Sequence, residues 1–300
     1  MDQNITMKFF EDIGCLYRAS MHVSWNRYPN YKSDIWDLLA IFLQGYAFER
    51  QGRKPDYFDV AVDALYDCKA RNHERFSNKI ISEIWSRFCE LLNDNNLNHQ
   101  NNPLCPKGTK YTKNFKIGKK SFYTSKASLI EVIIYNDLIE KKFTLTSYIQ
   151  HSILEKKDIS HVFNMLTSIQ GINKKISSFY LRDLVDVLKI PLNTVKNRHL
   201  LQPVDIWVRR TIGVLSNNKK IKESHGELDE EISEWIVNHC NNVNPEQVGM
   251  GIWLFGSEIA GSTYRLEQSL KNYALAFDLV DIFKKQIKDR YHNCIFFKKS

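Results

Sequence analysis

The chain has 300 residues, of which 43% are hydrophobic and 12% aromatic. These values exclude a disordered protein and are typical of a packed globular chain with one large domain or two small ones. Its 42 lysines and arginines exceed its 34 aspartates and glutamates, which gives a formal net charge of +8. That charge suits a polyanionic partner, although many proteins without such a partner are equally basic.

The cysteines and the N-terminus indicate the compartment. No Cys-x-x-Cys pair occurs among Cys15, Cys68, Cys89, Cys105, Cys240 and Cys294. This spacing argues against a disulfide framework or a zinc site and predicts reduced thiols. The N-terminus lacks the apolar core of a secretory signal, and no apolar run approaches the ~20 residues of a membrane span. We therefore expect an intracellular protein, in the cytoplasm and nucleoid or in the nucleus, without membrane contact.

Apolar residues recur at helical spacing along most of the chain. Such faces occur within 36–43, 60–65, 80–88 and 232–236, whereas alternating, strand-like runs are few and short. The sequence therefore predicts an all-α fold.

An Asn- and Lys-rich segment at 93–126 interrupts this pattern and predicts a loop insertion. No acidic residue occurs from Asn95 to Ile130, and lysines at 107, 110, 113, 116 and 119 are interspersed with aromatic residues. One interpretation is an arm that follows DNA phosphates and stacks on bases. The other is a solvated surface loop, because charged runs are commonly just solvated. The composition leaves both open.

Two predicted helices flank a glycine between 159 and 188. Apolar residues at 159, 162, 163 and 166 predict the first helix, which ends near Gly171, where a sharp reversal needs a positive φ. The second is expected from near Asn173 to Leu188. Its first amides lack partners within the helix and its dipole adds positive potential, so a phosphate can bind there whatever the base sequence.

A Pro-Val-Asp element at 203–205 precedes another predicted helix, Ile206–Leu215. Asp205 therefore lies at a helix start, where aspartate is a common cap. It follows Lys175, in the first turn of the earlier helix, by 30 residues.

Together these elements resemble the helix-hairpin-helix and Gly/Pro-Asp loop of the endonuclease III superfamily of DNA glycosylases. In that family a Leu-Pro-Gly-Val-Gly-x-Lys hairpin precedes a Val-Asp loop. The match covers about a sixth of the chain and places the hairpin at 169–173. It implies that Lys175 is the catalytic lysine and Asp205 the catalytic aspartate. It also implies that a monovalent cation faces carbonyls of the hairpin, namely those of Thr167, Ile169 and Ile172.

The match departs from the family in three respects. Asn173 replaces the second hairpin glycine, and asparagine tolerates the left-handed region better than most residues. The 30-residue spacing is longer than in most members and resembles the archaeal 8-oxoguanine glycosylase branch; the extra passage is expected to bulge out as a loop. The four-cysteine loop of many relatives is absent near the C-terminus, so no iron–sulfur cluster is expected and no cofactor is implied apart from the cation.

The resemblance implies a defined chemistry. The neutral amine of Lys175 would attack C1′ of the sugar and form a Schiff base, which permits β-elimination of the 3′ phosphate. Asp205 would stabilise the cationic sugar and help to deprotonate the lysine. The damaged base would leave the stack and enter a pocket. The alternative is that Lys175 is an ordinary exposed lysine and Asp205 only a helix cap.

Further residues are candidates for contact with DNA. The hairpin would contact DNA phosphates through Gly171, Asn173 and Lys174. Arg209 and Arg210 would also contact phosphates, or else belong to a solvated surface. Phe255 lies in a stretch that resembles the helix lining the base pocket of 8-oxoguanine glycosylases. It would stack on the flipped base, or else belong to the core.

We therefore expect an all-α, two-lobed helix-hairpin-helix glycosylase fold with DNA in the cleft between the lobes. One lobe would span 57–200 and the other 1–56 plus 202–300. The expected activity is removal of a damaged base, an oxidised purine such as 8-oxoguanine, from double-stranded DNA by a monomeric DNA glycosylase with AP-lyase action. Alternatives are a monofunctional glycosylase in which Asp205 activates water, an AP-site lyase or repair nuclease, and a helix-hairpin-helix DNA-binding protein without catalysis.

Overall fold

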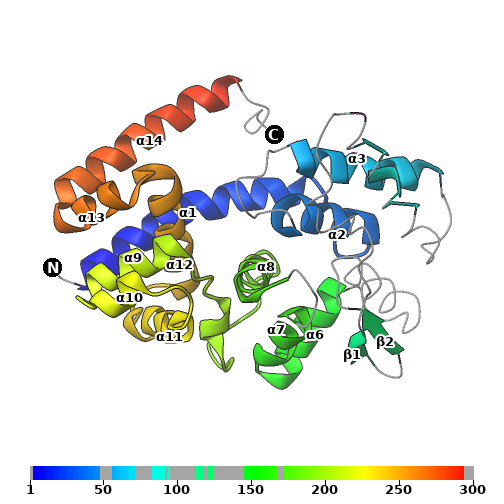
Figure 1. Ribbon diagram of the computed structural model, residues 1–300, viewed down its shortest axis with the longest axis horizontal. Coiled ribbons are helices and arrows are strands. Elements are labelled where there is room, and N and C mark those ends of the chain that lie inside the picture. Colours follow the sequence, from blue (N-terminus) through cyan, green and yellow to red (C-terminus); the bar gives the residue numbers. More distant parts are fainter. Residues whose placement is uncertain are drawn as a thin grey trace. The chain divides into compact units, whose positions relative to one another are not determined.

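The computed structural model describes residues 3–47, 56–71, 113–117, 120–123, 145–167 and 172–293, together with 83–84, 86–88, 90–91 and 94. Helices make up most of these segments, so the all-α class expected from the periodicity is confirmed at that level (Figure 1). Within these ranges, no helix combines the length and the apolar character needed to cross a membrane.

The chain divides into two compact units, one of residues 24–198 and one of residues 1–23 with 199–300. The lobes predicted from the sequence instead group residues 24–56 with the two terminal segments of the chain. The aromatic residues of this stretch explain the difference. The Trp25 ring lies 5.2 Å from that of Tyr31 and 6.4 Å from that of Tyr180, far along the chain. Hydrophobic periodicity alone does not reveal such a partner.

The unit of residues 24–198 is built around a buried hydrophobic helix, α2, all eight residues of which are buried. Asp34 caps this helix by accepting a hydrogen bond from the Trp36 amide at 2.9 Å. The elements of the unit are the end of α1 (Gln3–Asn26), α2 (Ile35–Phe42), the π-helical turn η1 (Leu43–Ala47), α3 (Asp56–Arg71), β1 (Lys113–Ile117), β2 (Lys120–Tyr123), α6 (Leu145–Lys156), α7 (Ser160–Thr167) and α8 (Lys174–Val187).

Two short strands lie in the segment predicted as a loop insertion. β1 and β2 pair antiparallel, with Phe115 opposite Phe122 and Ile117 opposite Lys120. The loop prediction is therefore wrong for these residues. Phe115 and Ile117 alternate with polar residues as in a strand, but this signal is short and set among lysines. The proposed contacts of this segment with DNA stay a prediction.

The other unit packs helices around one apolar core. This core includes Phe10, Val208, Ile232, Ile252 and Phe255, all at most 1% exposed. Besides most of α1, its elements are η2 (Arg198–Leu201), which begins at the unit boundary, α9 (Ile206–Leu215), α10 (Lys219–Glu223), α11 (Asp229–His239), α12 (Pro245–Leu254), the π-helical turn η3 (Phe255–Ala260), α13 (Thr263–Lys271) and α14 (Tyr273–Asn293).

Glycines allow α1 and α12 to touch backbone to backbone in this unit. A Cβ atom at Gly251 would lie 1.8 Å from the carbonyl oxygen of Phe10, and one at Gly14 would lie 2.0 Å from that of Gln247. Such distances exclude any side chain, so the crossing of α1 and α12 depends on these two residues.

Candidate functional site

The helix pair expected around the hairpin is present. α7 packs against α8, and Figure 1 shows them as neighbouring green helices. Val162, Phe163 and Leu166 are buried, as their spacing predicted. The reversal itself, residues 168–171, lies outside the described residues, and with it Ile169 and Gly171. Their cation and phosphate roles therefore stay predictions, as do those of Thr167 and Ile172, the described members of the cation set.

Asn173 determines where α8 begins. Its side chain accepts a hydrogen bond from the Ile176 amide at 2.9 Å, which is the geometry of a helix N-cap. Its φ of −89° and ψ of 176° are extended rather than left-handed. The left-handed conformation allowed for Asn173 is thus not adopted, because capping requires an extended backbone. The cap places Lys174 and Lys175 in the first turn of α8.

The two neighbouring lysines occupy different environments. Lys174 is exposed, whereas Lys175 is half-buried, with Nζ 5.3 Å from the centroid of the Phe179 ring. An ammonium over an aromatic face is attracted by the ring quadrupole. This position distinguishes Lys175 from a fully solvated surface lysine. Phe179 was not among the predicted site residues, although its i+4 spacing from Lys175 places it on the same helical face.

A buried charged network continues from Phe179. The guanidinium carbon of Arg182 lies 4.8 Å from the Phe179 centroid, and Arg182 Nε donates to Asp183 Oδ1 at 3.0 Å. The Tyr46 hydroxyl donates to Asp183 Oδ2 at 2.9 Å. Arg182 and Asp183 are at most 1% exposed. A buried ion pair tolerates little displacement because losing either partner leaves a buried charge, so the network stiffens the face of α8 that carries Lys175.

Residues 189–200, which lengthen the spacing between Lys175 and Asp205, form hydrogen bonds to the segment that leads into α7. The Lys196 amide donates to the Lys157 carbonyl at 2.8 Å, and the Ile159 amide donates to the Lys196 carbonyl at 3.2 Å. Ile190, Leu192 and Val195 are buried. The passage is a loop, as expected, but it is packed down and does not bulge outward.

Asp158 joins this loop to α7. Its Oδ1 accepts from Asn197 Nδ2 at 2.9 Å and from the Ser160 amide at 2.7 Å. Partial burial works against the charged form, but these hydrogen bonds together with the positive charge of Lys196 lower the pKa of Asp158 below its ordinary value.

Asp205 is the N-cap of α9. Its Oδ1 accepts hydrogen bonds from the amides of Trp207 at 2.9 Å and Val208 at 3.1 Å. The predicted cap is confirmed, and α9 has the bounds expected from the sequence. These capping bonds orient the half-buried carboxylate at the start of α9.

Lys175 and Asp205 belong to different units, since the boundary falls between residues 198 and 199. The structure positions each side chain within its own unit. The meeting of the two in one catalytic site stays a prediction.

Both arginines predicted to contact phosphate form ion pairs with carboxylates. Arg209 donates through Nε and one terminal nitrogen to Asp229 at 2.8 and 3.0 Å. Arg210 donates to Glu267 at 3.4 Å. A bidentate pair such as Arg209–Asp229 satisfies the guanidinium fork. These arginines brace α9 against α11 and α13, which favours a structural role over phosphate binding.

Phe255 occupies the core of its unit. Its exposure is 0%, and its ring lies edge-to-face against Phe9 at 5.5 Å and Phe10 at 6.0 Å. A ring enclosed in this way has no face for a flipped base. The position agrees with the core interpretation, which the sequence left open beside the stacking role.

Comparison with known proteins places the chain in no family. No protein-family profile matches it, and no solved structure matches it. It is similar to an uncharacterized protein of Methanocaldococcus jannaschii, with 25% identity over 244 residues, which are 78% of this chain and 54% of the archaeal protein. The chain thus spans about half the length of the curated relative it matches.

Proposed function

We propose that this protein is a helix-hairpin-helix DNA glycosylase with AP-lyase action, which removes an oxidised purine such as 8-oxoguanine from double-stranded DNA. The proposal rests on two features that occur together in the chain. A half-buried lysine, Lys175, lies in the first turn of the second helix of a helix pair, and a Pro-Val-Asp element 30 residues later orients Asp205 at the start of α9. These are the positions of the catalytic pair in the family that the sequence resembles.

In the proposed reaction, the neutral amine of Lys175 attacks C1′ of the damaged nucleotide. The C1′–base bond breaks as the N–C1′ bond forms, and the base leaves with a proton. Opening of the sugar ring gives a Schiff base between Lys175 and C1′, and loss of the 2′ proton expels the 3′ phosphate. Asp205 stabilises the cationic sugar and accepts the proton of the lysine. The packing of Lys175 on Phe179 limits the motion of the attacking amine.

The start of α8 supports a contact with the DNA backbone. Asn173 caps one amide, and Lys174 is exposed in the same turn. A helix N-terminus with an exposed cation favours a phosphate, and the net charge of +8 favours DNA in general.

A panel of duplexes tests this function. Each carries a single 8-oxoguanine, an oxidised pyrimidine or an abasic site, and is incubated with the full chain with and without borohydride. We expect release of 8-oxoguanine, strand cleavage on its 3′ side and a covalent adduct trapped by borohydride. Free base without an adduct would instead support a monofunctional glycosylase in which Asp205 activates water. An adduct on the abasic duplex alone would support a lyase without base excision. Binding without reaction across the panel would leave a DNA-binding module and overturn the proposal.

A further inference from the structure

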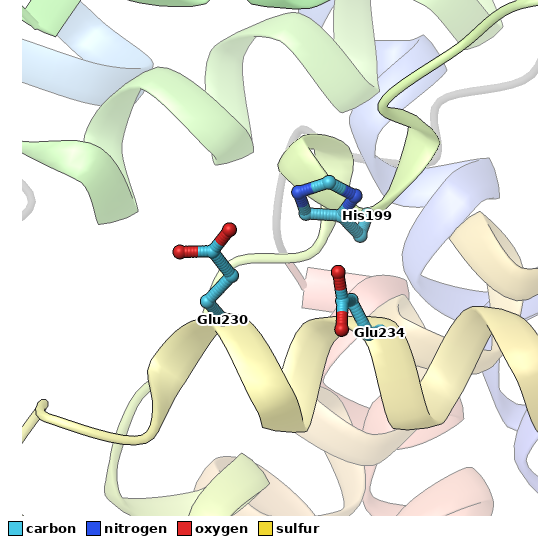
Figure 2. Close-up of side chains that lie close together, drawn as sticks. All are labelled: His199, Glu230 and Glu234. Atoms are coloured by element: carbon cyan, nitrogen blue, oxygen red, sulfur yellow. The ribbon is translucent and has the colours of Figure 1, made fainter.

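A cluster of potential metal ligands lies in the unit that contains Asp205. His199 in η2 and Glu230 and Glu234 in α11 place one ligand atom each so that all three lie within 4.8 Å of one another. Figure 2 shows the Glu234 carboxylate next to the His199 ring, with Glu230 on the preceding turn of the same helix. Glu230 and Glu234 have the i, i+4 spacing that brings side chains onto one face of a helix.

Hydrogen bonds and apolar packing fix the backbones of η2 and α11, which carry these three residues. The Gln202 amide donates to the His199 carbonyl at 2.9 Å, and Ser233 Oγ donates to the Gln202 carbonyl at 3.3 Å. Ser233 lies between the two glutamates on α11 and is 6% exposed. Ile232 and Ile236 of the same helix belong to the apolar core. The backbone positions of η2 and α11 therefore do not depend on the three side chains.

Among the residues that the structure describes, no ion-pair partner balances the charges of Glu230 and Glu234. At the start of α11, Asp229 forms an ion pair with Arg209. Two carboxylates directed to the same space repel one another, and a bound cation removes that repulsion. The imidazole adds a nitrogen ligand, which distinguishes this cluster from an ordinary acidic surface.

The donor set selects a class of metal ion. One imidazole nitrogen with two carboxylate oxygens suits zinc and the other divalent ions of the first transition row, whereas magnesium and calcium prefer all-oxygen sites. Ligand atoms of a tetrahedral zinc ion, with bonds of about 2.0–2.2 Å, lie about 3.3–3.6 Å apart. Binding therefore requires the two exposed glutamate side chains to rotate toward His199.

We propose that His199, Glu230 and Glu234 bind one divalent transition-metal ion of the zinc class, which ties η2 to α11. Three protein ligands leave at least one coordination position for water or an external ligand. His199 precedes Asp205 by six residues, so the ion also fixes the segment that leads into the capped start of α9. The site does not depend on the glycosylase proposal, because none of its three ligands takes part in the proposed reaction.

Calorimetric titration of the chelator-treated full chain tests this site. Zn²⁺ and Co²⁺ are the probes, and Mg²⁺ is the comparison ion. We expect one Zn²⁺ or Co²⁺ per chain, a raised thermal midpoint with either ion, and no comparable effect of Mg²⁺. His199→Ala and Glu234→Gln should weaken binding at least tenfold and abolish the rise in the midpoint. Matched controls are Glu231→Gln, an exposed acid in the first turn of the same helix, and His225→Ala, an exposed histidine of the same unit; both should bind as the unaltered chain does.

The Co²⁺ spectrum identifies the ligand atoms. Visible d–d bands without a sulfur-to-cobalt charge-transfer band are expected from nitrogen and oxygen ligands, and they exclude a site at Cys15 or Cys240. The proposal is wrong if the unaltered chain binds no stoichiometric ion, if the sulfur band appears, or if His199→Ala and Glu234→Gln bind as tightly as the controls. Each of these results is independent of any activity on DNA.

Discussion

Lys175 rests on Phe179: the ammonium nitrogen lies 5.3 Å from the centroid of the ring, one turn further along α8. Arg182 approaches the same ring, with its guanidinium carbon 4.8 Å from the centroid. One aromatic side chain thus contacts both the proposed nucleophile and a buried cation that is paired with Asp183. This contact links the position of the amine to the packed interior of its unit.

Replacing Phe179 by leucine should slow the reaction of Lys175. The ring limits the motion of the attacking amine, so its loss should slow borohydride trapping on an 8-oxoguanine duplex about two- to fivefold. The substitution should lower the free energy of unfolding by under ~2 kcal/mol, since the core is only partly emptied. Phe163→Leu, a buried phenylalanine of α7, is the control: it should lose comparable stability in urea melts without slowing the trapping. Equal rates for both variants would contradict a role for the ring.

Two substitutions of Asp205 separate its role as a helix cap from the proposed role of its negative charge. Asn is as good an N-cap as Asp, so Asp205→Asn should leave the free energy of unfolding nearly unchanged while base release falls about 10²-fold or more, as when a transition-state-stabilising group is lost. Asp205→Ala should also lose the cap and about 0.5–2 kcal/mol of stability. Asn244→Ala, which removes the cap of α12, should lower stability alone. Full activity in Asp205→Asn would leave the aspartate as a cap and nothing more.

Local features of the sequence predicted the local structure of the candidate site. The apolar spacing around Val162 and Leu166 and the Asp before Ile206 predicted α7 and α9, because periodicity and capping act within a few residues. The packing partners were not predictable in this way. Arg209 pairs with a carboxylate 20 residues away and Arg210 with one 57 residues away. The enclosure of Phe255 likewise depends on Phe9 and Phe10 at the other end of the chain.

Gly251 should be irreplaceable for a steric reason. A Cβ atom at this position would meet the Phe10 carbonyl oxygen at 1.8 Å, so Gly251→Ala must push α12 away from α1. Overpacking of this kind costs about 1–3 kcal/mol, and backbone contacts are at the upper end or beyond. Gly45→Ala is the control, because a Cβ atom there would meet no neighbouring element of the described chain within 4 Å. Thermal melts should show a lower midpoint for Gly251→Ala only; equal midpoints would contradict the close crossing of the two helices.

Asp158 should contribute acid-sensitive stability. Its folded-state pKa lies below the ordinary value of 3.8, so its contribution is fully present above pH 3.8 and is lost as the pH falls through the lower folded-state value. Asp158→Asn should therefore reduce the loss of unfolding free energy between pH 7 and pH 3 in urea melts. The exposed Asp281 provides the control, Asp281→Asn, which should retain the full pH dependence. The same acid sensitivity in Asp158→Asn as in the unaltered chain would rule out this linkage.

The assignment of Lys175 as the nucleophile is the central claim, and Lys174 beside it provides the matched control. Both lie in the first turn of α8, but Lys175 is half-buried over Phe179 whereas Lys174 is exposed. The most direct measurement is borohydride trapping on an 8-oxoguanine duplex, followed by mass mapping of the modified peptide. The account predicts an adduct on Lys175 that Lys175→Gln abolishes and Lys174→Gln retains. An adduct that persists in Lys175→Gln, or the absence of any adduct with the unaltered chain, would contradict it.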